Sequence, residues 1–144
     1  MKVLVGFVDT REGHAAVRAA IGEVKANGGE LHLVSHLAAP LDNAAAMSHM
    51  GRVDTERERL EGEAERIRER EGIPCTAHLL QDSDRTSVAI LRAVEEIGAD
   101  RIVIGTRRRS AIGKALLGST AQELLLASPV AVLSVKATED VTKL

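Results

Sequence analysis

Apolar residues form short continuous runs along the chain, and these runs alternate with stretches of helical spacing. Each run predicts a strand, and a continuous run such as 3–8 indicates a parallel strand covered on both faces. The run at 75–80 is shorter and more polar, and we expect it at an edge of the sheet. The stretches between them repeat apolar residues three and four positions apart, which indicates helices with one buried face. This alternation predicts a doubly wound α/β fold with a five-stranded parallel sheet. The runs lie at 3–8, 31–36, 75–80, 101–104 and 130–135.

Three of the predicted helices have recognisable ends in the sequence. The first ends at 27–29, Asn-Gly-Gly, which tolerates positive φ. A later helix begins near Thr86 and ends at Gly98, and the last spans 119–127 before a proline. These signals predict short connections between most of the elements.

The second crossover is harder to interpret. Residues 37–51 show no clear period, and we expect a long irregular connection or a lid there. Residues 54–71 are strongly charged with a narrow apolar stripe, and oppositely charged residues lie three apart, such as Glu56 and Arg59. This pattern is typical of a solvated helix.

Length, charge and composition restrict the class of protein. A chain of 144 residues fits one domain over 1–144, able to bury about 70% of its unfolded surface. Its net charge of −2 and its single aromatic residue, Phe7, do not favour a nucleic-acid partner. The single cysteine, Cys75, suits a reducing cytosol, and no apolar run approaches the ~20 residues of a membrane span. We therefore expect a cytoplasmic protein that binds neither nucleic acid nor membrane.

The stretch after the fourth run carries the strongest chemical signal. Gly105 follows 101–104 where we expect the strand to end in a sharp turn, and an arginine-rich loop comes next. This loop closes on Gly118, Ser119 and Thr120, immediately before the last helix. A glycine and two hydroxyl residues at a helix start offer backbone N–H groups, side-chain donors and the positive end of the helix dipole. The sequence therefore predicts an anion site.

The spacing of this stretch fits neither a P-loop nor a G-x-G-x-x-G dinucleotide loop. It resembles the nucleotide loop of the universal stress protein family, in which glycine, two residues, glycine, nine residues and glycine precede Ser or Thr. Gly105, Gly118 and Ser119 match this pattern, and Arg108 stands where the family has its second glycine. The resemblance extends over residues 3–135.

The resemblance implies strand order 3-2-1-4-5 and a stress-response regulatory protein that binds ATP or a related adenine nucleotide, with Mg²⁺. In relatives the acidic residue after the first strand meets the adenine or ribose, and the backbone after the second strand lines the base. We also expect Arg108 to lie near the phosphates and to strengthen their binding. The implied nucleotide-binding residues are Asp9, His36, Ile104, Gly105, Arg108, Gly118, Ser119 and Thr120.

We do not expect an efficient enzyme. Hydrolysis requires a base that positions water near the terminal phosphate, and the loop supplies cations and hydroxyls but neither acid nor histidine. No catalytic or metal-binding residue is therefore assigned. His14 is expected to be an isolated surface residue, and Cys75, which has no basic neighbour in the sequence, a buried structural thiol.

Other interpretations remain open at this point. Asp9 could cap the first helix instead of meeting a ligand. A receiver domain would place acids after the first and third strands, a hydroxyl after the fourth and a lysine after the fifth. Asp9, Asp82, Thr106 and Lys136 occupy such places, but only one acid follows the first strand.

A third interpretation is a dimeric interaction module of the same fold that binds no nucleotide, with Arg108 blocking the site. In either family interpretation we expect a homodimer through the last strand, Val130 to Val135. That strand is apolar on both faces although the implied order places it at a sheet edge, where an unprotected apolar strand favours pairing.

Overall fold

The computed structural model describes residues 1–40, 46–106 and 117–137. All strand pairs are parallel, and the strand order is β3-β2-β1-β4-β5. This confirms the predicted α/β fold and its order 3-2-1-4-5. The elements are β1 (Lys2–Gly6), α1 (Arg11–Asn27), β2 (Glu30–Ala38), α2 (Ala46–Glu71), β3 (Cys75–Asp82), α3 (Thr86–Ile97), β4 (Arg101–Thr106), α4 (Ser119–Ala127) and β5 (Ala131–Lys136).

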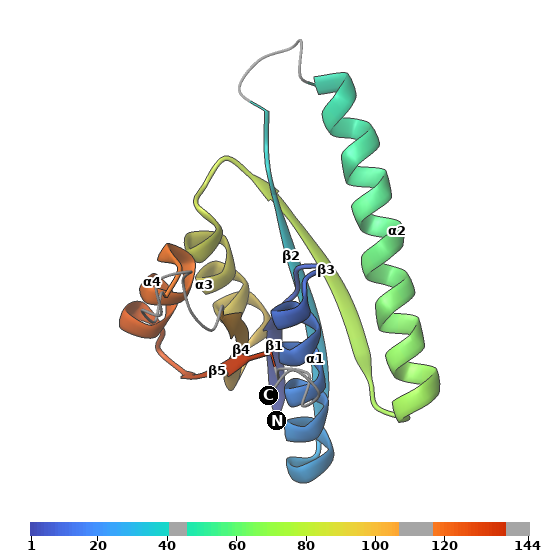
Figure 1. Ribbon diagram of the computed structural model, residues 1–144, viewed down its shortest axis with the longest axis vertical. Helices are drawn as coiled ribbons and strands as arrows, with labels where there is room; N and C mark the ends of the chain where they lie inside the picture. Colours follow the sequence, from blue (N-terminus) through green and yellow to red (C-terminus); the bar gives the residue numbers. More distant parts are fainter. Residues whose placement is uncertain (41–45, 107–116, 138–144) are drawn as a thin grey trace, which may run out of the picture.

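Helices cover both faces of the sheet (Figure 1). Alternate residues of each strand point to opposite faces, so Val3 and Val5 belong to one core and Leu4 to the other, all with no exposed surface. The first core packs against α1 and α2, and the second against α3 and α4. This two-sided burial explains why the central strands read as continuous apolar runs.

Helix α2 is longer than the sequence pattern indicated. β2 continues to Ala38 and α2 begins at Ala46, so the expected irregular connection is wrong at 37–38 and at 46–51, while 41–45 lie outside the described residues. The first half of α2 shows no apolar period because none of the helix's buried residues lies there. No helix in the described ranges is both long and apolar enough to cross a membrane. The buried residues of α2, Leu60, Ala64 and Ile67, all lie in its second half.

Gly105 serves a different purpose from the expected turn. It lies inside β4, which continues to Thr106, and it is not among the glycines with positive φ. A Cβ atom added to Gly105 would lie 2.1 Å from the backbone oxygen of Glu12. Gly13 is equally crowded, with 1.8 Å from its ideal Cβ to the oxygen of Val8. Both glycines therefore allow the start of α1 to lie directly against the carboxyl ends of β1 and β4.

β5 lies at the edge of the sheet, as the implied order requires. Leu133 and Val135 pack against one core, and Val130 and Val132 against the other, yet each keeps part of its surface exposed. The homodimer through this strand stays a prediction.

Candidate functional site

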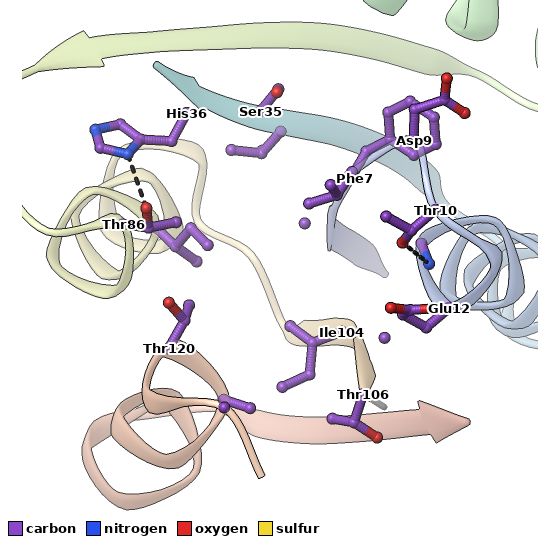
Figure 2. Close-up of a pocket in the computed structure, with 18 of the residues that line it drawn as sticks. Phe7, Asp9, Thr10, Glu12, Ser35, His36, Thr86, Ile104, Thr106 and Thr120 are labelled. Atoms are coloured by element: carbon purple, nitrogen blue, oxygen red, sulfur yellow. Dashed lines mark hydrogen bonds between the residues drawn. The ribbon is translucent and has the colours of Figure 1, made fainter. Parts of the chain in front are cut away.

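The carboxyl ends of β1, β2 and β4 surround a cavity of about 820 Å³ (Figure 2). The chain runs from β1 outward to β2 and β3 on one side and to β4 and β5 on the other, so the cavity lies at the switch point where α/β folds bind ligands. Arg108 lies outside the described residues. The other predicted site residues line this cavity: Asp9, His36, Ile104, Gly105, Gly118, Ser119 and Thr120.

The start of α4 forms one wall of the cavity. Gly118 is the N-cap residue, no side chain caps the helix there, and the first turn contains no acidic residue. A Cβ atom added to Gly118 would meet no atom of the described residues within 4 Å, so they leave the space beside it open. The N–H groups of the first turn and the hydroxyls of Ser119 and Thr120 are thus available to an anion.

The starts of α3 and α4 are held together. Glu123 accepts hydrogen bonds from Ser87 and from Arg85, with 3.1 Å between Arg85 Nη1 and Glu123 Oε1. Both helices therefore present their N-terminal ends to the same side of the cavity, where two helix dipoles favour negative charge. The contribution of the α3 dipole to this side of the cavity was not evident from the loop motif alone.

Asp9 lies at the mouth of the cavity and does not cap α1. Thr10 caps the helix, accepting a hydrogen bond from the Gly13 N–H at 3.1 Å. The Asp9 carboxylate instead bonds His14 Nε2 at 2.8 Å, and its Oδ2 lies 3.9 Å from Arg59 Nη1. The hydrogen bond from His14 lowers the pKa of the Asp9 carboxyl below its ordinary value. The capping alternative is therefore wrong, and Asp9 presents a negative charge at the mouth.

His14 is not the isolated surface residue that the sequence predicted. Besides its bond to Asp9, its ring meets the Phe7 ring edge-on, with 5.4 Å between centroids and 80° between planes. The strand-to-helix turn brings these side chains together, and no sequence signal marks the contact.

Helix α2 contributes a polar wall that sequence reasoning did not assign to the site. Ser35 Oγ, near the end of β2, donates to Glu56 Oε1 at 3.0 Å. Glu56 also pairs with Arg59 at 3.4 Å, which is the ion pair expected from their spacing. Ser35, Glu56 and Arg59 all line the cavity, so α2 borders it.

The side chain of His36 joins two other elements beside the cavity. Its Nδ1 lies 3.0 Å from Thr86 Oγ1, at the start of α3, and its Nε2 lies 2.9 Å from Asp82 Oδ1, at the end of β3. The hydrogen bond from His36 lowers the pKa of the Asp82 carboxyl, and the Asp84 N–H at 3.0 Å adds to this effect. Figure 2 shows Thr86 and His36 meeting at one side of the cavity. The sequence pointed to the backbone near His36 and missed these side-chain partners.

The strand order excludes the receiver arrangement. A receiver sheet has its third strand beside the first, whereas β2 here separates β3 from β1. Asp82 is thus two strands away from Asp9 and is engaged with His36. Thr106 is 6% exposed and accepts a hydrogen bond from Ser134 at 3.2 Å.

The remaining candidates are structural. Cys75 is buried, as predicted, and burial raises the pKa of its thiol to about 11. Arg68 is a basic neighbour that the sequence did not reveal, donating to the Cys75 carbonyl at 2.7 Å, but burial has the larger effect on the thiol. His32 bonds His78 at 2.8 Å. Within the described ranges, no three His, Cys, Asp or Glu side chains are grouped to hold a metal ion.

The fold and the cavity together define a doubly wound α/β protein with a ligand crevice at its topological switch point. The profile of the universal stress protein family matches residues 1–136, and the chain belongs to this family. It is 33% identical over 136 residues to a universal stress protein of Mycolicibacterium smegmatis, covering 93% of this chain and 96% of the relative.

Solved structures agree with this assignment. A universal stress protein from Archaeoglobus fulgidus is 26% identical, with a TM-score of 0.75 and coverage of 93% of this chain and 97% of the other. A universal stress protein from the same organism, solved in complex with dAMP, is 22% identical with a TM-score of 0.66, covering 93% and 96% of the two chains. The structure of the dAMP complex shares the fold of this chain.

Proposed function

We propose that this protein binds an adenine nucleotide, ATP or a close relative, in the crevice and acts as a cytoplasmic stress-response regulator through its bound state. The observation that carries the proposal is the uncapped start of α4, which opens with two hydroxyl residues onto a cavity of about 820 Å³. The dAMP complex of a family relative supports an adenine nucleotide as the ligand.

The phosphates would lie at the start of α4. The backbone N–H groups after Gly118 and the hydroxyls of Ser119 and Thr120 are donors of the kind that phosphate oxygens accept. The open space beside Gly118 leaves room for them. A Mg²⁺ ion would be held mainly by the phosphates themselves, and the hydroxyl of Ser119 would supply a protein oxygen ligand.

The base and ribose would extend from α4 across β1 towards β2. The two interstrand steps from β4 to β2 measure about 10 Å, which leaves the base near the end of β2. Val34, Ile90 and Ile104 provide apolar surface along this path. The Asp9 carboxylate at the mouth is an acceptor for ribose hydroxyls.

We infer a binding protein rather than an efficient enzyme. The first turn of α4 contributes hydroxyls and N–H groups but no carboxylate or imidazole to activate water. With Mg²⁺ and ATP we expect phosphate release far slower than ~1 s⁻¹. A faster rate in a steady-state phosphate assay would contradict the binding role.

Isothermal titration calorimetry with MgATP tests the proposed function directly. Ser119→Ala should weaken binding by about two- to tenfold, because it removes one hydrogen bond to phosphate. Ser134→Ala is the matched control, because Ser134 bonds Thr106 and does not line the cavity. Absence of MgATP binding by the wild type would favour the nucleotide-free interaction module.

The same proposal includes a homodimer through β5, whose edge position and partly exposed apolar residues favour pairing. Val132→Lys should shift the protein to a monomer in sedimentation velocity at micromolar concentration. An unchanged sedimentation coefficient for this variant, or a monomeric wild type, would contradict the dimer.

A further inference from the structure

Helix α4 is held to α3 by the carboxylate of Glu123, which lies outside the crevice. Glu123 accepts hydrogen bonds from Ser87 Oγ and from Arg85 Nη1, and we call these two contacts the α3–α4 clamp. We propose that Glu123 is a positioning residue, which holds the start of α4 in the orientation that binds the phosphates of the nucleotide. The inference rests on the proposed nucleotide site and assigns a role to a residue that does not line it.

The apolar contacts of α4 leave its orientation poorly fixed. Among the nine residues of α4, all of which the structure describes, only Ala121 and Leu124 are buried. Leu125 and Leu126 are 43% and 88% exposed, so they add little packing. Apolar contact is not directional, and a helix with two buried side chains can still roll about its own axis. The polar contacts of α4 therefore decide which way its first turn faces.

The clamp acts on the face of α4 that carries Ser119. Residues four apart share one face of a helix, so Ser119 lies one turn before Glu123 on the same side of α4. A roll that broke the clamp would turn the Ser119 hydroxyl away from its present place in the wall of the crevice. Figure 2 shows Thr86 and Thr120, from the starts of α3 and α4, on the same side of the crevice. The clamp thus relates the two helix starts to each other.

The two donors of the clamp differ in strength. Ser87 is 2% exposed, so water does not compete for its hydroxyl. The Arg85 side chain is 74% exposed, and its ion pair with Glu123 is screened by solvent. The hydrogen bond from Ser87 is therefore the stronger constraint. In the same turn, Gln122 Nε2 donates to the Leu117 carbonyl at 3.0 Å, which holds the segment that enters the helix.

Two effects of Glu123 on phosphate binding have opposite signs. Its negative charge lies one turn after the first residue of α4, where it opposes a bound anion. Its hydrogen bonds hold the phosphate donors in place, so less freedom is lost when a phosphate binds. Arg85 offsets much of the charge at 3.1 Å, and we expect the positioning effect to be the larger one. Loss of the charge alone would tighten ATP binding, whereas loss of the clamp would weaken it.

MgATP and adenosine test the inference because only MgATP reaches the start of α4 with phosphates. Both affinities are measured by displacement of a fluorescent ATP derivative at one salt concentration. Glu123→Ala should bind MgATP at least about fivefold more weakly than the wild type, and adenosine within about twofold of it. Glu123→Gln loses the charge, but its amide can accept from Arg85 and donate to the Ser87 hydroxyl, so it should restore MgATP binding. A merely structural role would weaken MgATP and adenosine alike.

Two further variants separate the clamp from net charge and from failure to fold. Glu95→Ala is the matched control, because Glu95 is an exposed carboxylate of α3, and it should leave MgATP affinity within about twofold. Ser87→Ala removes one donor of the clamp and keeps Glu123, so it should weaken MgATP and spare adenosine. It also keeps the test available if Glu123→Ala fails to fold. Adding Ser87→Ala to Glu123→Ala should weaken MgATP no further, because the two residues act through one contact.

NMR order parameters of the free protein supply a readout that needs no ligand. Those of the Ser119 and Thr120 amides should be lower in Glu123→Ala than in the wild type and in Glu123→Gln. Unchanged order parameters, MgATP binding as tight in folded Glu123→Ala as in the wild type, or an equal loss for MgATP and adenosine would each overturn the positioning role and leave the nucleotide site intact. Failure of the wild type to bind MgATP would overturn both.

Discussion

Replacing Gly105 by alanine should destabilise the protein even though the change adds one methyl group. The new Cβ would lie 2.1 Å from the Glu12 backbone oxygen and 2.5 Å from its carbonyl carbon. Real Cβ contacts of this kind are longer by about 1 Å, so α1 or β4 must shift. Because the obstacle is backbone and not the end of a flexible side chain, no rotamer change relieves it.

Two opposing effects set the size of the loss. Alanine restricts the unfolded chain and, at a position with ordinary φ, stabilises by about 0.4–1 kcal/mol. Overpacking against a rigid neighbour costs about 1–3 kcal/mol. The clash is severe and involves backbone, so we take the upper end of the overpacking cost, about 3 kcal/mol. Subtracting the gain from the restricted unfolded chain leaves a net loss of about 2 kcal/mol. At about 2.1 cal/mol/K of unfolding entropy per residue, this lowers Tm by about 7 °C.

Thermal and urea unfolding of Gly105→Ala and Gly22→Ala provide the measurement. Gly22 lies inside α1 with nothing within 4 Å of its ideal Cβ, so alanine there should stabilise by about 0.5–1 kcal/mol. Opposite signs for the two glycines would support the packing argument. A Gly105→Ala protein as stable as the wild type would refute it.

The remaining predictions concern the site, the core and the loop. His14→Ala should raise the pKa of Asp9 towards its ordinary value of 3.8, seen by NMR titration. Because the pKa of Asp9 is lower in the folded than in the unfolded protein, the contact with His14 stabilises the fold above pH 3.8. This stabilisation is lost as the pH falls through the folded-state pKa. An unchanged Asp9 titration in the variant would contradict the contact. Leu60→Ala, at a residue 1% exposed, should cost about 2–5 kcal/mol in urea unfolding, and a loss below about 1 kcal/mol would mean that α2 is poorly anchored. Arg108→Gly should weaken MgATP binding at least about tenfold and flatten its salt dependence, whereas tighter binding would identify Arg108 as a blocking residue.

Much of the fold could be predicted because its determinants are local. Continuous apolar runs marked the buried strands, and Gly28 and Gly98 marked helix ends where φ is indeed positive, at 75° and 73°. The strand order came from the family resemblance, since parallel pairing leaves no short-range signal. Residues 46–53 of α2 were missed because a helical segment without buried residues has no reason to show an apolar period.

The site was predictable only where one motif contains it. Gly118, Ser119 and Thr120 are consecutive, so their convergence on an anion site follows from local structure. The contact between Asp9 and His14 and the chain from Asp82 through His36 to Thr86 join separate elements. Their partners depend on strand register and helix placement, which the spacing of residues in the sequence does not encode.

The unequal anchoring of α2 has a consequence for local unfolding. Its second half is held by Leu60, Ala64 and Ile67, while the half that begins at Ala46 contains no buried residue and exposes Met47 at 84%. Amide hydrogen exchange should therefore be fast in the early turns and slow near Ile67, with opening free energies that rise along a single helix. Glu56 and Arg59 stand at the boundary and also line the crevice. A ligand that contacts Glu56 and Arg59 would extend the slowly exchanging part of α2 towards Ala46. Its binding would then be measured as increased amide protection several turns away from the crevice.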